Sequence, residues 1–89
     1  MILFLYFIFM DDPIEVKARL KEFGNNLRRA RVVRCVTLES LSGKANLNIR
    51  TLQRIEAGQM NVLITTVMRL KQGLDCPWHE LLPTSLQQK

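Results

Sequence analysis

Apolar residues recur along most of this chain at the three- and four-residue spacing of amphipathic helices, and short polar segments separate the resulting blocks. The first block begins at Asp12-Pro13, a cap followed by a first-turn proline, and runs to about Arg34. Gly24-Asn25-Asn26 interrupts it, and there we expect the helix to bend or to begin again. The inward positions are Val16, Leu20, Phe23, Leu27 and Ala30.

The next two predicted helices are separated by a turn of about three residues, a helix-turn-helix arrangement. Thr37 is the expected cap of the first helix. Its apolar face is formed by Leu38, Leu41 and Ala45. Asn46 follows at a position that needs a left-handed backbone, which asparagine tolerates better than most residues. Asn48 caps the second helix, which ends at Gly58.

Two further helices are predicted after the polar loop that follows Gly58. Asn61 is the expected cap of the longer one, and Asp75 marks its end. Its apolar face consists of Leu63, Val67, Leu70 and Leu74. A short helix from Trp78 to Leu82, with Leu81 and Leu82 facing inward, closes the domain. The pattern predicts an all-α, five-helix domain over residues 12–83, preceded by an apolar leader at 1–11 and followed by a frayed tail at 84–89.

Glu56 occupies an unexpected position on the apolar face of the third predicted helix. It shares one stripe with Ile49, Leu52 and Ile55. A carboxylate in an apolar stripe is costly unless a cation compensates for its lost hydration. The sequence therefore predicts a specific cationic partner for Glu56 elsewhere in the chain.

Length and charge restrict the classes of function. The 89 residues fit one domain, and the formal net charge is +5. Residues 17–54 contain ten basic side chains and two acidic ones, which suggests a face that meets a polyanion, either nucleic acid or an acidic membrane surface. No acid, base, nucleophile or metal ligands cluster in the sequence, and the only histidine is His79. We therefore expect neither an enzyme nor a cofactor.

Cys35 and Cys76 lie 41 residues apart, which is neither a zinc-binding spacing nor a disulfide framework. We expect both to be small buried hydrophobic residues in a reducing cytoplasm. The leader, MILFLYFIFM, is too short to cross a bilayer as a helix, and it lacks the basic start and small-residue cleavage site of a secretory signal. Three alternatives stay open for it: translated upstream sequence before a true start at Met10, a β-prone arm that pairs between subunits, or membrane association.

The polar face of the third helix carries the candidate chemistry. The major groove of DNA admits one helix, and the second helix of a helix-turn-helix presents its outer face to base edges there. Arg50 and Arg54 lie four residues apart and match the acceptors of guanine, while Gln53 can bind adenine or a phosphate. Thr51 and Ile49 can touch a thymine methyl group.

The sequence resembles the lambda-repressor-like helix-turn-helix family, the Cro, phage-repressor or XRE-like type of bacterial regulator. The resemblance covers residues 23–82. In the first helix it consists of Gly24, Leu27-Arg28 and Arg31. The central motif is Thr37-Leu38-Glu39-Ser40-Leu41, Ala45, Asn46-Leu47-Asn48, Leu52, Arg54-Ile55-Glu56 and Gly58. The last part is Thr66-Val67, Leu70, Leu74-Asp75-Cys76-Pro77 and Glu80-Leu81-Leu82.

The resemblance implies that Arg31 is the cation that pairs with Glu56. It also implies that DNA is contacted by Asn48, Ile49, Arg50, Thr51 and Arg54. The sequence departs from the family where Leu38 replaces a glutamine near phosphate, where Asn46 replaces a turn glycine, and where Val62-Leu63 replaces a Pro-Ser helix start. Lys71 and Gly73 replace small alanines, so we expect looser packing there.

The combined interpretation is a cytoplasmic, sequence-specific double-stranded DNA-binding protein, a transcriptional repressor acting as a homodimer. The dimer surface is expected on the last helix, around Trp78, or in the leader. Within the same class, an antitoxin with a toxin or other protein partner, or a restriction-modification controller, stays open. The alternative from another class is a protein-interaction or membrane-associated module that uses the basic face and the leader.

Overall fold

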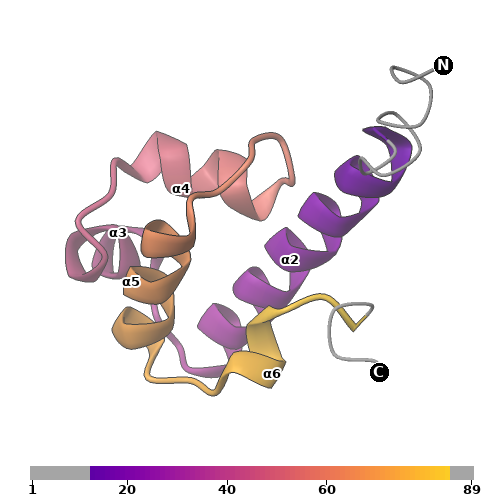
Figure 1. Ribbon diagram of the computed structural model, residues 1–89. Helices are drawn as coiled ribbons and strands as arrows, with labels where there is room; N and C mark the ends of the chain where they lie inside the picture. The colour runs from indigo at the N-terminus through magenta and orange to yellow at the C-terminus, as the bar shows by residue number, and fades with distance from the viewer. Residues whose placement is uncertain (1–12, 85–89) are drawn as a thin grey trace, which may run out of the picture.

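Five helices and no strand make up residues 13–84, the part of the chain that a computed structural model describes (Figure 1). They are α2 (Pro13–Val33), α3 (Leu38–Lys44), α4 (Ile49–Glu56), α5 (Ile64–Leu74) and α6 (Trp78–Leu81). The predicted all-α, five-helix fold is confirmed. The predictions for the leader at 1–11 and for the tail from residue 85 onward lie outside the described residues.

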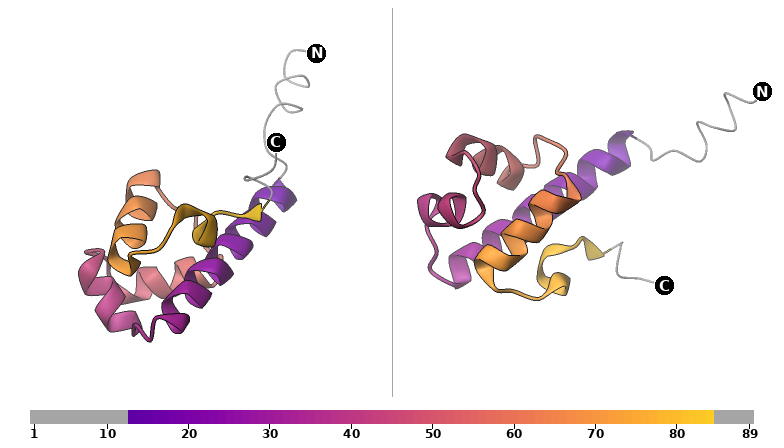
Figure 2. Two further views of the ribbon diagram at one scale, coloured as in Figure 1. Left: turned by 90° about the horizontal axis from the view of Figure 1, so that it is seen from below. Right: turned by 60° about the vertical axis from the view of Figure 1, so that its left-hand side comes forward.

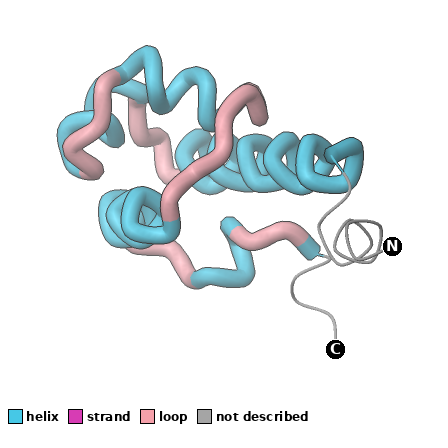
Figure 3. Tube along the Cα trace, turned by 45° about the horizontal axis from the view of Figure 1, so that its top comes forward, coloured by secondary structure: helices cyan, strands magenta, loops and turns pink. Residues whose placement is uncertain are grey.

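The longest helix, α2, organises the domain. Helices α4 and α6 pack against α2, and α3 packs against both α4 and α5. Figure 3 shows α4 and α6 on different sides of α2. The N-terminal turns of α2 extend past the other helices in each view of Figure 2. The C-terminal part of α2 therefore belongs to the shared core, and its N-terminal part projects from it.

Of the two outcomes predicted at Gly24, a new helix start is wrong, because α2 is continuous from Pro13 to Val33. A Cβ atom at Gly24 would lie 2.5 Å from the backbone carbonyl oxygens of both Ile55 and Glu56. The glycine is needed for this close approach between α2 and the end of α4. It marks a contact between helices and not a helix break.

The predicted caps and turns around α3 and α4 are present. The Thr37 hydroxyl accepts a hydrogen bond from the Ser40 backbone N–H at 3.0 Å, which caps α3. Asn46 has φ 54°, the left-handed conformation expected there, and Gly58 after α4 has φ 72°. The turn between α3 and α4 therefore has the cap and the left-handed residue that the sequence predicts.

The start of α5 differs from the prediction. Asn61 does not cap the helix; its side-chain oxygen accepts a hydrogen bond from the neighbouring Val62 N–H at 2.9 Å. The cap position is Leu63, which has no side-chain hydrogen bond to offer, and α5 begins at Ile64. Leu63 is 73% exposed, so it does not share the buried face of α5. The helix is held by its buried face and not by a polar cap.

The core lies between all five helices. It consists of Phe23, Leu27, Ala30, Leu41, Ala45, Leu52, Ile55, Val67, Leu70, Leu74, Cys76 and Leu81. Of the expected inward residues, Val16, Leu20 and Leu82 are only half-buried. The expectation for Cys35 is wrong, because this residue is exposed in the turn after α2, where it adopts φ 57°. Cys76 is buried as expected, and burial raises the pKa of its thiol.

Candidate nucleic-acid interface

The N-terminus of α4 is fixed by the preceding asparagine. The Asn48 side-chain oxygen accepts a hydrogen bond from the Arg50 backbone N–H at 2.8 Å. Leu52 and Ile55 then point into the core, with 0% and 1% of their surface exposed. The inner face of α4 is therefore held at both its first turn and its middle.

Arg31 and Glu56 lie together at the junction of α2 and α4. Arg31 Nε donates to Glu56 Oε2 at 2.6 Å, and Arg31 Nη2 donates to Glu56 Oε1 at 3.1 Å. The third guanidinium nitrogen, Nη1, donates to the Val36 carbonyl at 3.0 Å. Only 12% and 8% of the two side chains is exposed. This two-pronged pair ties α4 to α2 and to the turn before α3, and it provides the cation that the position of Glu56 requires.

The outer face of α4 is polar and exposed. Arg50, Gln53 and Arg54 all point to solvent, and within residues 13–84 neither arginine takes part in an ion pair. Ile49 is 38% exposed, and Thr51 is half-buried beside it. The structure brings the predicted contact residues to one end and one face of α4. Their contacts with DNA stay a prediction.

A shallow hollow borders this face. It has a volume of about 240 Å³ and lies where α2, α3 and α4 meet. Arg28 and Gln53 line it together with Leu38 and the Arg31–Glu56 pair. The hollow thus places a basic side chain of α2 beside a polar side chain of the candidate reading surface.

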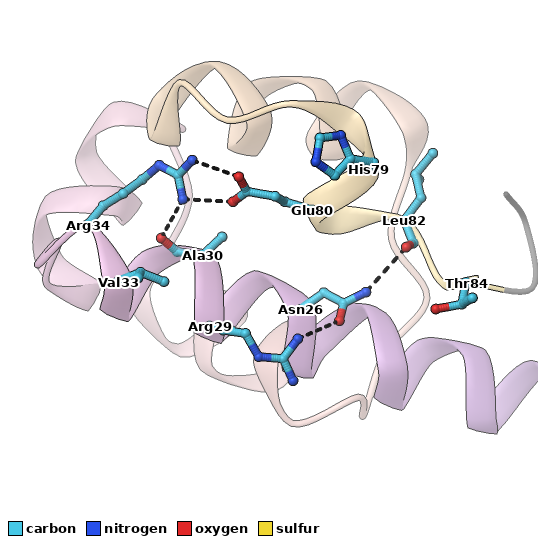
Figure 4. Close-up of a pocket in the computed structure, with 9 residues that line it drawn as sticks. All are labelled: Asn26, Arg29, Ala30, Val33, Arg34, His79, Glu80, Leu82 and Thr84. Carbon is cyan, nitrogen blue, oxygen red and sulfur yellow. Dashed lines mark hydrogen bonds and ion pairs between the residues drawn. The ribbon is translucent and has the colours of Figure 1, made fainter.

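The other side of α2 is joined to α6 by polar contacts, shown in Figure 4. Arg34 donates from Nη1 to Glu80 Oε1 at 2.9 Å and from Nη2 to Oε2 at 3.3 Å. These hydrogen bonds lower the pKa of the Glu80 carboxyl and raise the pKa of the Arg34 guanidinium. Asn26 Nδ2 donates to the carbonyls of Leu81 and Leu82 at 3.1 and 3.3 Å.

These groups line a hollow of about 690 Å³ between α2 and α6. It is larger than the one beside α4, but it lies on the side of α2 that faces α6, where its polar groups already bind one another (Figure 4). Sequence reasoning missed the Arg34–Glu80 pair. An arginine near the end of one helix and a glutamate in the first turn of another are signals, but a single sequence does not say that these helix ends meet.

Two further structural findings concern residues 13–84 alone. Over that range no helix is both long enough and apolar enough to cross a membrane. In the same range no three histidine, cysteine, aspartate or glutamate side chains gather closely enough to hold a metal ion.

A short helix, a tight turn and a second helix with an exposed basic face define a helix-turn-helix domain. No protein-family model matches the sequence, and no curated protein matches it. Among solved structures, the chain is similar to the restriction-modification controller protein C.AhdI from Aeromonas hydrophila, with 31% sequence identity and a TM-score of 0.70. The match covers 73% of this chain and 98% of C.AhdI. The chain belongs to the lambda-repressor-like helix-turn-helix family of DNA-binding proteins.

Proposed function

We propose that the protein is a transcription regulator that recognises a specific double-stranded DNA sequence with α4 in the major groove. The observation that carries the proposal is the division of α4 into two faces. Leu52, Ile55 and Glu56 fix the inner face, whereas Arg50 and Arg54 stand exposed on the outer face without an ion-pair partner in residues 13–84. A rigidly held helix with free hydrogen-bond donors is what reading base edges requires.

The chemistry of the outer face favours recognition of guanine. Arg50 and Arg54 are four residues apart, hence neighbours along the exposed side of α4. A guanidinium fork matches the two major-groove acceptors of guanine, and a good bidentate contact discriminates against a wrong base by about 1–3 kcal/mol. Gln53 between them is suited to adenine or a phosphate. Asn48 and the helix N-terminus are suited to a phosphate.

We propose that two copies bind together. One such domain makes a single half-site contact, so a homodimer reading half-sites about 34 Å apart supplies affinity and an inverted-repeat preference. Leu63, Ile64 and Met68 form an exposed apolar cluster at the N-terminal end of α5, with 73%, 66% and 45% of their surface exposed. Clusters of this kind mark interaction surfaces. They favour α5 as the dimer contact over the last helix, where Trp78 is 38% exposed and Lys71 covers its ring.

The proposal is tested by selecting bound sequences from random duplexes with wild type, Arg50→Ala and Arg54→Ala. We expect the wild type to select a short inverted repeat. Each variant should stay folded and lose preference at particular base pairs, by about 1–3 kcal/mol per lost bidentate contact. Arg29→Ala is the matched control, because Arg29 is an exposed arginine on the side of α2 that faces α6. Equal binding of all sequences by the wild type would contradict specific recognition.

The particular role favoured by the comparison is control of restriction-modification genes, since C.AhdI is a restriction-modification controller protein. The other role of the same class is that of an antitoxin, whose DNA binding is controlled by a toxin partner. Neighbouring genes encoding a nuclease and a methyltransferase would support the first role, and a neighbouring toxin gene the second. Repression is the expected outcome at a site that overlaps a promoter, because bound protein excludes the polymerase; a reporter fused to that promoter tests it.

The rival function is that of a membrane-associated or protein-interaction module. In it, the basic face binds anionic lipid and the leader inserts. Flotation with anionic vesicles, for the full chain and for a chain lacking residues 1–9, separates the two functions. Vesicle binding by both forms, together with no shift of any duplex, would replace DNA recognition by membrane association.

A further inference from the structure

We infer that α2 carries a second DNA-contact surface, the α2 basic stripe formed by Lys17, Lys21 and Arg28, which binds backbone phosphates beyond the groove that α4 reads. The inference rests on the proposed DNA-binding function and deepens it. It assigns a role to residues outside the helix-turn-helix and to the projecting N-terminal half of α2.

Several basic residues on α2 and directly after it already have partners. Arg31 and Arg34 pair with Glu56 and Glu80. Arg19 pairs with Glu15 one turn earlier. Arg29 donates a hydrogen bond to Asn26. Within residues 13–84, the basic side chains of α2 that make no ion pair or side-chain hydrogen bond are Lys17, Lys21 and Arg28.

These three residues lie on one side of α2. Positions 17, 21 and 28 are separated by four and seven residues, so at 3.6 residues per turn they fall on one narrow stripe. The same stripe contains Gly24, where α2 touches the end of α4. The unpaired charge of α2 therefore lies on the side of α2 that packs on α4 and not on the side that packs on α6.

Each of the three basic residues lines a hollow beside α4 or beside the loop that follows it. Lys17 and Lys21 line a hollow of about 730 Å³ together with residues 57–61, the segment that directly follows α4. Contact there is close, because a Cβ atom at Gly58 would lie 2.6 Å from the Lys21 Cα. Arg28 lines the hollow that contains Gln53. All three basic residues thus border α4 or the loop after it.

The loop itself explains why α2 is needed. Residues 57–63 contain no lysine or arginine, so beyond Arg54 in the last turn of α4 the positive charge beside this loop comes from α2. Lysine and arginine neutralise phosphates without reading bases. Eleven residues of helix rise about 16 Å. One strand presents a phosphate about every 3.4 Å of duplex axis, so this length can span more than one phosphate. The stripe thus has the chemistry and the length of a backbone contact.

The test measures how DNA affinity depends on salt for wild type, Lys17→Gln/Lys21→Gln and Lys17→Gln/Lys21→Gln/Arg28→Gln. The probe is a fluorescently labelled duplex of one arbitrary sequence. Its binding is measured by fluorescence anisotropy from 50 to 200 mM salt. The slope of log affinity against log salt is negative, and each lost phosphate contact should bring it closer to zero by about 0.9. Over this fourfold range the wild type should therefore lose about tenfold more affinity than the double variant. The triple variant should show a still flatter slope.

Arg19→Gln/Arg29→Gln is the matched control, because it removes the same charge from exposed or half-buried positions off the stripe of the same helix. The salt slope of this control should differ from the wild-type slope by less than about 0.45, half the value of one phosphate contact. Thermal melting should show that every variant is folded. Equal slope changes in the control and the stripe variants would show that net charge alone determines the salt dependence, and would overturn the inference. Unchanged slopes in all variants would also overturn it, as would loss of phosphatidylserine-vesicle binding in the stripe variants with DNA slopes unaffected.

The two proposals fail separately. If selection from random duplexes yields no preferred sequence, specific recognition by α4 is wrong. The slopes on the duplex of arbitrary sequence still decide the role of the stripe, because phosphate contacts do not depend on sequence. In the opposite case, the wild type selects an inverted repeat but the stripe variants keep the wild-type salt slope. This result would support recognition by α4 and contradict the phosphate-binding role of the α2 basic stripe.

Discussion

At the scale of single residues, glycines have opposite roles at two helical positions. Gly24 sits where the backbone of α4 leaves no room for a side chain, since an added Cβ would be 2.5 Å from two carbonyl oxygens. Gly43 in α3 has nothing within 4 Å of such an atom. The same residue type is therefore required at one position and a cost in helix propensity at the other.

Substituting each glycine by alanine tests this contrast. Gly24→Ala should destabilise the fold by about 1–3 kcal/mol or more, because backbone must move to relieve the overlap. Gly43→Ala should stabilise it by up to about 1 kcal/mol, since alanine is the better helix former. Chemical denaturation monitored by circular dichroism measures both. Equal effects of the two substitutions would contradict the close contact at Gly24.

The Glu80 carboxyl gives the fold a dependence on pH. Hydrogen bonds from Arg34 lower its pKa below the ordinary 4.5. The ionised form is favoured in the folded state, so its contribution to stability is complete well above pH 4.5 and is lost as pH falls through the lowered pKa. The difference in melting temperature between wild type and Glu80→Gln should therefore be largest near pH 7 and shrink towards pH 3. A difference in melting temperature that is equal at pH 7 and pH 3 would contradict a role for the ionised carboxylate.

At the scale of helices, the ion pair between Arg31 and Glu56 joins α2 to α4 through two residues that are 25 positions apart in sequence. Both side chains are nearly buried, so removal of one partner leaves the other charge without compensation. Arg31→Ala or Glu56→Ala should each cost about 3–5 kcal/mol, a large share of the stability of a small domain.

A double-mutant cycle separates this pairing from simple loss of packing. With Arg31→Met and Glu56→Leu as the single variants of the cycle, the double variant leaves no charge buried, so it should be more stable than either of them. Additive losses in the denaturation free energies of the cycle would show that the two side chains act independently. The outcome also calibrates experiments on α4, because damage to Glu56 should unfold the domain whereas damage to Arg50 should leave it folded.

Helix existence could be predicted from sequence wherever local chemistry determines it. Pro13, Thr37, Asn46 and Asn48 act within one turn of their own position, and the structure shows each in the expected role. The start of α5 could not be predicted in this way, because no side chain caps it. Leu63 fits the apolar period of α5 yet is exposed. Periodicity alone does not distinguish an apolar residue that faces the core from one that lies on the surface.

The candidate site was predictable to a similar extent. Position along an amphipathic helix places Arg50, Gln53 and Arg54 on the outer face, and the structure exposes all three. The pairing of Arg31 with Glu56 came from a family resemblance together with the need of a buried carboxylate for a cation. Lys17 and Lys21 carry no such signal in the sequence, because their significance depends on the approach of residues 57–61 to α2, a contact between distant segments.

At the scale of the whole molecule, the proposed dimer makes DNA binding depend on protein concentration. Ile64 and Met68 are one turn apart on α5 and exposed, while Val67 and Leu70 of the same helix face the core. Ile64→Lys/Met68→Lys should therefore leave the melting of the monomer fold nearly unchanged and shift sedimentation from dimer to monomer. Binding to an inverted repeat should weaken much more than binding to one half-site.

Two controls complete this experiment. Val32→Lys/Val33→Lys introduces the same charges at exposed apolar positions in the last turn of α2, on a different helix from the α5 cluster. This protein should sediment as the wild type does. A wild type that remains monomeric at every concentration and on the inverted repeat would contradict assembly through α5.

The attachment of α4 to the domain has a consequence for retargeting by directed evolution. Its position is set by the backbone contact at Gly24 and by Arg31–Glu56, neither of which involves the outward-facing side chains. A combinatorial library randomised at positions 50, 53 and 54 should hence retain a high fraction of folded members, whereas one randomised at 24, 31 and 56 should not. The domain separates the residues that maintain the scaffold from those that can diversify, so new target sequences become accessible without renewed selection for stability.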